Sequence, residues 1–559
     1  MQSRIVNVTE RTTSWNSVKW KNASRVVRRL RQRIFKATKG GSLKLVRNLQ
    51  KLLMRSYSNI LLSVRRVTQL NNGSRTAGVD KLLVKTPQAR GTLVDILTKF
   101  TPWQPLPVKR VYIRKSSKKL RPLGIPCIID RCLQAIVKNA LEPYWEAQFE
   151  RTSYGFRIGR SCHDAIERIH SMSKANSTKH WVVDADIQGC FDNISHIPLM
   201  KSIGNFPARK LILQWLEAGY VDRGVFYDTN SGVPQGGIIS PLLANIALHG
   251  MESALGIKYD KNGYNISNRG IVRYADDLVV FCQTEEDAVK ARETLQEFVL
   301  TRGLTLSEEK THIAPLTKGF NFLGFNIRQY PDSSTKTGRK VLIKPSKESL
   351  QRIRDKIKQI WLDYQSHSID VIIDKLNPII RGIANYFRTV VSSHIFKVLD
   401  RWMFERERRY AKRMHAKKSQ SWRNHRYWGR LNLDREDYWV FGNKRTGKHL
   451  LKFSWFNIHR HPMVKGASSP DDSTLQSYWD ARRKIKSKSL IPSYQKIAQK
   501  QGFVCPVCGE SLFNDEPLQK HHTISLHHGG DSRYDNLELL HYYCHQQVHL
   551  QPDDVLSLW

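Results

Sequence analysis

Two short apolar runs carry acidic residues at positions where a strand would be buried, and this pattern limits the possible folds more than any other. The run HWVVDADI contains Asp184 and Asp186, and the run GIVRYADDLVVF contains Asp276 and Asp277. The second run predicts a β-hairpin whose turn presents two adjacent carboxylates. Adjacent acids in an apolar hairpin repel each other and lose hydration. They are understandable if divalent cations lie between them and a third acid on the neighbouring strand.

The acidic hairpin therefore suggests a metal-dependent site. Mg²⁺ prefers carboxylates together with substrate phosphate oxygens. Two such ions can activate a 3′-hydroxyl and stabilise a leaving pyrophosphate. On the acid pair alone, a solvated hairpin tip with two surface acids is an equally open interpretation.

The charge of the chain predicts a polyanionic partner. The 559 residues include 91 Lys and Arg against 49 Asp and Glu, which gives a net charge of +42. Such an excess strains a compact fold unless a polyanion neutralises it, and nucleic acid does so with release of counterions. A membrane surface is the competing partner, but the sequence has no long uncharged apolar run and no lipidation site. The N-terminus lacks an apolar signal core, so we expect an intracellular protein.

The length predicts three to five domains. The first part of the chain reads as basic helices in 16–70, a turn-rich loop in 72–80 and mixed strands and helices in 101–330. Helices are expected in 345–415, and they overlap a basic aromatic run in 400–430. The stretch 466–477 has the composition of a linker, and a Cys/His block occupies 505–549. The 8 cysteines are too few for a disulfide framework, and three of them lie in the last 55 residues.

Three motifs, in the usual order, resemble those of reverse transcriptases. They are DIQGCFD at 186–192, GVPQGGIISP at 232–241, in the version of group II intron and related retroelement proteins, and YADD at 274–277. The resemblance implies that Asp186, Asp276 and Asp277 bind metal. It implies that Phe191 is a steric gate against a ribose 2′-OH and that Gln235 contacts the nascent base pair and template. We expect Asp184 and Asp192 to be structural.

The segment upstream of these motifs resembles the fingers hairpin of the same family. It reads VYIRKSSKKLRPLGIP at 111–126. Its cations would hold the triphosphate of an incoming deoxynucleotide, and we assign this role to Lys115 and Arg121. GLTLSEEKT at 303–311 resembles a later motif of the polymerase palm, in which Lys310 could protonate the leaving pyrophosphate.

The helical middle of the chain resembles the maturase domain of group II intron proteins, which doubles as the polymerase thumb. The matching stretch is LNPIIRGIANYFR at 376–388. A plain helical bundle is the alternative. The run that follows interleaves Arg and Lys with Trp402, Trp422 and Trp428, and it predicts RNA or DNA contact by charge and by stacking.

The Cys/His block predicts a structural zinc site. Cys505 and Cys508 have the spacing of one half-site, and His541 and Cys544 supply the other. A redox-active Cys pair is the alternative, but the dense histidines and the lack of a βαβ context disfavour it.

The remaining histidines resemble those of an HNH ββα-metal nuclease. His545 and His549 are four residues apart and share a helix face, and with His521 they could hold one divalent cation. The resemblance makes His522 the general base for water and Asn536 the residue that orients it. His541 departs from the commoner Cys. A purely structural zinc knuckle is the alternative.

Together these motifs identify the chain as a group II intron-encoded protein. The fold class that this implies is multidomain α+β, with right-hand polymerase fingers and palm, a helical thumb/maturase domain and a small ββα-metal tail that contains zinc. The expected domains are a basic helical extension of the fingers in 1–100, fingers and palm in 101–335, thumb/maturase domain in 336–430, a basic DNA-binding region and linker in 431–495, and the endonuclease in 496–559.

The resemblance also implies a function in retrohoming. The protein would copy RNA into DNA, help its intron to splice, and nick one target strand to prime the copying. The implied partners are intron RNA, target double-stranded DNA and deoxynucleoside triphosphates, without a membrane; the implied cofactors are Mg²⁺ and Zn²⁺. The expected location is the bacterial cytoplasm or nucleoid, or an organelle. The alternatives are a splicing cofactor with degenerate enzymatic domains and another lineage, such as a retron or a diversity-generating element.

Overall fold

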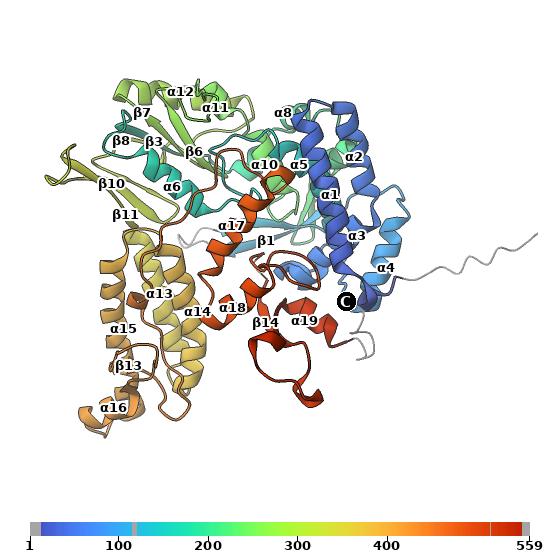
Figure 1. Ribbon diagram of the computed structural model, residues 1–559. Coiled ribbons are helices and arrows are strands. Elements are labelled where there is room, and N and C mark those ends of the chain that lie inside the picture. The colour runs from blue at the N-terminus through green and yellow to red at the C-terminus, as the bar shows by residue number, and fades with distance from the viewer. Residues whose placement is uncertain (1–12, 115–119, 515, 551–559) are drawn as a thin grey trace, which may run out of the picture.

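The chain folds into several helical and sheet units that pack around shared cores (Figure 1). The computed structural model describes residues 13–114, 120–514 and 516–550. Lys115, one of the two predicted triphosphate ligands, lies outside the described residues. The expected mixture of helices and sheets in several units is confirmed.

The N-terminal region is helical and basic, as predicted. Its helices are α1 (Trp20–Lys39), α2 (Leu43–Arg55), α3 (Tyr57–Arg65) and α4 (Pro87–Thr98), with a π-helical turn at Arg66–Leu70. In α1, Val27, Leu30 and Ile34 recur at helical spacing and are buried, while most Arg and Lys side chains of the helix face outward. The buried stripe packs on α5 (Ile128–Glu146), which is a central helix of the molecule.

A four-stranded antiparallel sheet contains the two acidic runs. Its order is β6 (Gly270–Tyr274), β7 (Asp277–Cys282), β3 (Trp181–Asp186), β8 (His312–Pro315). Helix α12 (Glu285–Leu300) covers one face and α6 (Cys162–Met172) the other (Figure 1). Alternate residues of the strands therefore enter different cores: Val183 and Val280 pack with α12, and Val182 and Val279 with α6. The predicted hairpin is confirmed, since β6 and β7 pair across a two-residue turn.

A second sheet and five further helices belong to the same part of the chain. The second sheet has the order β2 (Leu120–Ile125), β1 (Val108–Arg114), β4 (Tyr220–Asp222), β5 (Val225–Tyr227). The helices are α7 (Cys190–Asn193), α8 (His196–Ile203), α9 (Arg209–Glu217), α10 (Ser240–Ala247) and α11 (Met251–Ala254).

A helical bundle follows the three-stranded sheet β9 (Phe320–Phe322), β10 (Phe325–Pro331), β11 (Arg339–Pro345). Its members are α13 (Lys347–Asp363), α14 (Ile369–Phe387), α15 (Ser393–Met414) and α16 (Gln420–Tyr427), and the strands β12 (Trp428–Gly429) and β13 (Val440–Phe441) close it. Figure 1 shows the long helices side by side below β10 and β11. The helical pattern predicted for 345–415 is confirmed.

One aromatic residue of the basic run does not have its predicted role. Trp428 is only 4% exposed and packs against Phe441, and its indole nitrogen donates a 3.1 Å hydrogen bond to Glu407 Oε2. The prediction that Trp428 stacks on nucleic acid was therefore wrong, because the strand after α16 turns this ring into the bundle core. Trp422 is exposed, in keeping with the prediction.

The C-terminal part forms a small ββα unit beside the N-terminal helices (Figure 1). Its elements are α17 (Gln476–Ser487), α18 (Pro492–Lys500), β14 (Leu518–His522), β15 (Leu537–His541) and α19 (Tyr542–Val548). Short 3₁₀ turns complete the described chain at Trp15–Ser17, Asn72–Arg75, Phe453–Trp455, Ser473–Leu475, Leu526–His528 and Tyr534–Asn536. Among the described ranges, no helix has both the length and the apolar character needed to cross a membrane.

The segment 466–477 was expected to be a linker, and this expectation was wrong. Asp471 is buried, and its carboxylate accepts hydrogen bonds of 2.9 and 2.7 Å from Arg31 in α1. The same guanidinium also donates to Glu142 in α5 at 3.0 Å. Polar composition predicts a solvated linker, but here one acid of the segment is the partner of a buried cation.

Removing the Asp471 carboxylate should loosen this attachment. The change Asp471→Ala leaves Arg31 buried with one of its two acidic partners, so we expect a loss of roughly 3 kcal/mol in stability. The measurement is the melting temperature, together with the rate of limited proteolysis within 466–477. The exposed Asp434→Ala is the matched control. Equal proteolysis rates in the two variants would show that the Arg31–Asp471 ion pair does not hold this segment in place.

Candidate functional site

The acidic residues of the two runs gather at one edge of the first sheet. Asp186 ends β3 and lies directly opposite Asp277, the first residue of β7. Asp276 is in the turn between β6 and β7. Since side chains alternate along a strand, Asp184 points to the same face as Asp186. The pairing thus brings the three predicted metal ligands and a fourth carboxylate to one place.

The hairpin turn is held in a conformation that its sequence does not favour. Ala275 has a φ of 60°, which is uncommon for a residue with a side chain. The buried Arg273 donates to Asn245 Oδ1 at 2.9 Å and to the carbonyl of Ala275 at 3.3 Å. On the other side, a Cβ added to Gly155 would overlap the amide nitrogen of Ala275. The loop before α6 therefore needs glycine there to press closely against the acidic turn.

Burial and mutual repulsion raise the pKa values of Asp184, Asp276 and Asp277. Burial, followed by the charges of Asp276 and Asp186, raises the pKa of Asp277 to about 6. Burial, followed by Asp277 and Asp186, raises the pKa of Asp184 to about 7. The pKa of Asp276 is also raised, chiefly by burial. Each carboxylate is therefore held at an energetic disadvantage that a bound cation would remove.

Lys310, for which the resemblance implied a role at the leaving pyrophosphate, lies against the acidic group. Its ammonium forms a 2.7 Å ion pair with Asp186 Oδ2, and this hydrogen bond raises the pKa of Lys310. The carboxylate oxygens of Asp186, Asp276 and Asp277 do not all lie within 4.8 Å of one another. Three carboxylates at one sheet edge nevertheless fit a hard divalent cation, which would compete with Lys310 for Asp186.

Arg121, Gln235 and Phe191 border the same edge. Gln235 Oε1 accepts a 2.9 Å hydrogen bond from Arg121 Nε, and the Gln235 carbonyl accepts from the amide of Gly124 at 2.7 Å. These contacts tie the β1–β2 hairpin to the 232–241 loop. Phe191, in α7, is buried edge-on to Phe156 with ring centroids 6.2 Å apart.

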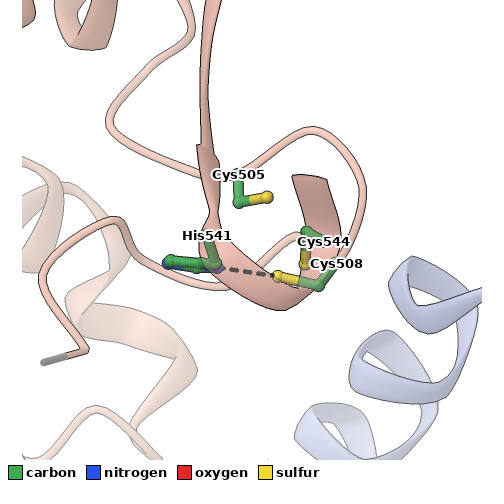
Figure 2. Close-up of side chains that lie close together, drawn as sticks. All are labelled: Cys505, Cys508, His541 and Cys544. Carbon is green, nitrogen blue, oxygen red and sulfur yellow. Dashed lines mark hydrogen bonds between the residues drawn. The ribbon is translucent and has the colours of Figure 1, made fainter. Parts of the chain in front are cut away.

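The four residues of the tail that were predicted to bind zinc are buried and lie together, so they could hold a metal ion. Cys505, Cys508, His541 and Cys544 place their ligand atoms within 4.8 Å of one another. Figure 2 shows the four side chains converging, with His541 Nδ1 3.3 Å from Cys508 Sγ. His541 ends β15 and Cys544 lies in the first turn of α19, while the two other cysteines come from the loop after α18. Three sulfurs and one imidazole nitrogen are the donor set of a tetrahedral structural zinc site.

The second predicted metal group is also assembled. His521 of β14 faces His545 of α19 and His549 next to it, and their ligand nitrogens lie within 4.8 Å of one another. Burial, followed by the neighbouring His545 and His549, lowers the pKa of His521 to about 4. His521 is therefore neutral at physiological pH, as metal ligation requires.

The predicted contact between His522 and Asn536 takes a different form. The two amide protons of Asn536 bond the carbonyls of Ile524 and Asp531, and Oδ1 accepts from the Ile524 amide. His522 Nε2 instead lies 3.3 Å from Ser532 Oγ. Asn536 therefore shapes the loop that carries Ser532, so any orientation of His522 by Asn536 is indirect.

Two features of the acidic site were not predicted. Asp184 was expected to be structural, although its two-residue spacing from Asp186 on a strand already placed both on one face. The bonds from Arg273 to Asn245 and to the turn carbonyl join distant segments, so no local pattern could have indicated them.

Four segments of the chain match known protein families. Residues 15–97 match the N-terminal domain of reverse transcriptase, and residues 113–327 match reverse transcriptase (RNA-dependent DNA polymerase). Residues 350–428 match the group II intron maturase-specific domain, and residues 505–551 match HNH endonuclease.

Several curated proteins are similar to the chain. The group II intron-encoded protein LtrA of Lactococcus lactis is 33% identical over 368 residues, which cover 51% of this chain and 61% of LtrA. Protein YkfC of Escherichia coli is 36% identical over 304 residues, covering 48% of this chain and 80% of YkfC. Maturase-like protein 1 of Euglena gracilis is 26% identical and covers 66% of this chain and 76% of its own length. The chain thus spans about three fifths of the length of LtrA.

The raised pKa values predict that acid stabilises the protein in buffer without added divalent cations. Asp184 and Asp277 keep a proton in the folded state up to about pH 7 and 6, whereas the unfolded chain releases it near pH 4. Their stabilising effect is therefore complete below pH 4 and is lost as pH rises through about 6 to 7. Melting temperatures measured from pH 5 to pH 8 should fall.

The isosteric change Asp184→Asn removes one of these acids. It should raise stability at pH 8 by on the order of 1–3 kcal/mol and flatten the fall with pH. The exposed Asp228→Asn is the control and should leave the profile as in the parent. If the melting temperature of Asp184→Asn depends on pH as that of the parent does, the Asp184 carboxyl is not held protonated in the folded protein.

Proposed function

The chain belongs to the family of group II intron-encoded proteins, and we propose on this basis that it is an RNA-directed DNA polymerase, a splicing maturase and a site-specific DNA endonuclease. The observation that carries the polymerase activity is the in-register pairing of Asp186 with Asp277 beside the Asp276 turn. The raised pKa values of Asp276 and Asp277, and the position that these two acids share with Asp186, support a role in binding catalytic cations.

The polymerase reaction joins a primer 3′-oxygen to the α-phosphate of an incoming deoxynucleotide and expels pyrophosphate. Two Mg²⁺ ions, when bound, would lower the pKa of the 3′-hydroxyl and stabilise the charge on the leaving group. Asp186, Asp276 and Asp277 would hold these ions. Lys310, released from Asp186 by the ions, would be free to donate a proton to the pyrophosphate.

The residues around this edge would select and align the substrate. Arg121 and Lys115 would bind the triphosphate of the incoming nucleotide. The hydrogen bond from Arg121 to Gln235 supports a position of both side chains next to the nascent base pair. The buried ring of Phe191 would leave no room for a ribose 2′-OH. In this proposal β1, β2 and the N-terminal helices are the fingers, the β6-β7-β3-β8 sheet is the palm, and α13–α15 are the thumb.

The basic helix α15 and its continuation would bind intron RNA. Arg408, Arg409 and Lys412 are exposed along α15, and Arg406 lies 4.9 Å over the Trp402 ring. Cations attract the phosphate backbone, and the exposed Trp422 can stack on an unpaired base. Binding of structured intron RNA by this surface is the proposed basis of assisted splicing.

The tail would nick one strand of the target DNA. His522 would remove a proton from the attacking water, and a divalent cation held by His521, His545 and His549 would stabilise the phosphate charge. The four buried residues of Figure 2 would hold zinc as a structural element. The nicked strand would then prime copying of the intron RNA.

The boundaries of the proposed domains follow the same scheme. They are 1–100 for the fingers extension, 101–335 for fingers and palm, 336–430 for thumb/maturase domain, 431–495 for the basic DNA-binding region and 496–559 for the endonuclease. The proposed partners are intron RNA, target double-stranded DNA and deoxynucleoside triphosphates. The proposed location is the bacterial cytoplasm or nucleoid, or an organelle.

Replacing one shared ligand should stop DNA synthesis. Asp276→Asn keeps the shape of the side chain but misplaces the cations, so extension of a DNA primer on an RNA template should fall by roughly 100-fold or more. RNA binding should stay near the parent value. Glu293→Gln, an exposed acid on α12, is the control. Primer extension by folded Asp276→Asn at the parent rate would exclude this site.

Removing the proposed base should separate nicking from zinc binding. His522→Ala should abolish nicking of a duplex that contains the natural insertion site, while zinc content and primer extension stay unchanged. The exposed His527→Ala is the control. If His522→Ala nicks as the parent does, the tail is a structural zinc module instead.

A further inference from the structure

The zinc-ligand cluster of the tail lies in a core that it shares with the N-terminal helices. One continuous apolar cluster contains Trp20 at the start of α1, Ile60 and Val64 of α3, and Cys508 and Cys544 of the tail. Figure 1 shows α19 and β14 beside the lower ends of these helices. The ligands of the proposed zinc site are therefore covered by another part of the chain, more than 400 residues away in sequence.

Arg65, the last residue of α3, reaches this cluster directly. Its guanidinium nitrogen Nη2 lies 2.9 Å from Cys544 Sγ. The side chain is 4% exposed, and its guanidinium carbon lies 4.4 Å from the centre of the Trp20 ring. Trp15 packs edge-on against Trp20 with centroids 5.0 Å apart. The Trp20 ring, backed by Trp15, thus lies against the guanidinium and beside Cys544.

The charges of the two groups are complementary. Zinc bound by three thiolates and one neutral imidazole carries a net charge of minus one. A buried guanidinium carries plus one, and it is costly to bury without a partner. Hydrogen bonds to coordinated sulfur also reduce the negative charge on the thiolate. Arg65 therefore supplies the counter-charge for the zinc cluster, and the cluster, with Glu516 beside His541, supplies the counter-charge for Arg65.

Further contacts flank Arg65 and align the two surfaces. Arg28 of α1 donates to the carbonyl of Gly509 at 2.9 Å, on the loop that begins with the two cysteines. Gln547 of α19 donates to the carbonyls of Asn16 and Val18 at 2.8 and 3.1 Å. The Arg28–Glu510 ion pair is half exposed and contributes little by itself.

We propose that Arg65 is a positioning residue of the zinc centre, and that zinc binding by the tail and docking of the tail on the N-terminal helices are a single coupled equilibrium. When zinc leaves, the three released thiolates take up protons, and most of the negative charge facing Arg65 is lost. Only the weaker interaction with Glu516 remains for the buried guanidinium, so the tail separates from α1 and α3. Loss of Arg65 leaves an uncompensated anionic cluster, so zinc is bound more weakly. The coupling rests on zinc occupying the four residues, and it is independent of whether the tail cleaves DNA.

The first experiment measures zinc affinity in the full-length protein by competition with a chromogenic chelator. Arg65→Gln should weaken zinc binding about 10- to 100-fold. Arg65→Lys keeps the charge and should restore part of the loss. Arg66→Gln, the exposed neighbour on α3's C-terminal side, is the matched control and should bind zinc as the parent does. Equal affinity of Arg65→Gln and the parent would overturn the proposal.

The second experiment needs no substitution and remains decisive if Arg65→Gln does not fold. Amide hydrogen exchange is compared in the zinc-loaded and zinc-stripped parent protein. Zinc removal should speed exchange in the first turns of α1 and in α3 as well as in the tail, but not in α2, whose buried residues Val46 and Leu49 belong to another core. Faster exchange restricted to residues 496–550, or a purified protein that binds no zinc, would overturn the coupling.

Discussion

The antiparallel pairing of β3 with β7 is the interaction on which the proposed polymerase site depends. It sets Asp186 opposite Asp277 and leaves Asp276 in the adjoining turn. Because α6 and α12 bury both faces of this sheet, a slip of one residue would move every apolar side chain to the wrong core. The cores therefore determine the register, and the register determines which carboxylates meet.

The same packing buries Asp184 and Asp277 in positions that disfavour their ionised forms. Burial raises the pKa of Asp184 to about 7 and that of Asp277 to about 6. The turn between β6 and β7, just before Asp277, contains Ala275 at a positive φ, held by Arg273 and by the close approach of Gly155. A rigid scaffold thus keeps repelling carboxylates together before any cation binds, which is the arrangement that a preorganised metal site requires.

Part of the large positive charge is internal to the fold. Arg31 joins α1 to Asp471 and Glu142, and Arg65 joins α3 to Cys544. These buried guanidinium groups connect the two ends of the chain, so they are not available to nucleic acid. The cations Arg408, Arg409 and Lys412 of α15, by contrast, are exposed. The C-terminal unit is consequently part of the same packed body as the N-terminal helices and is not a tethered appendage.

The sequence by itself determined the acidic hairpin, the helical middle, and the two metal-ligand groups of the tail. Each follows from alternation, helical periodicity or close spacing, as in the run that contains Asp276 and Asp277 or in the pair Cys505 and Cys508. These are local properties, and neighbours in sequence determine them. Only the tertiary structure decided that Trp428 is core, that 466–477 is docked, and that Asn536 shapes a loop. It alone decided that Arg65 faces Cys544, because the cost of burying a polar group depends on which distant partner the fold brings to it.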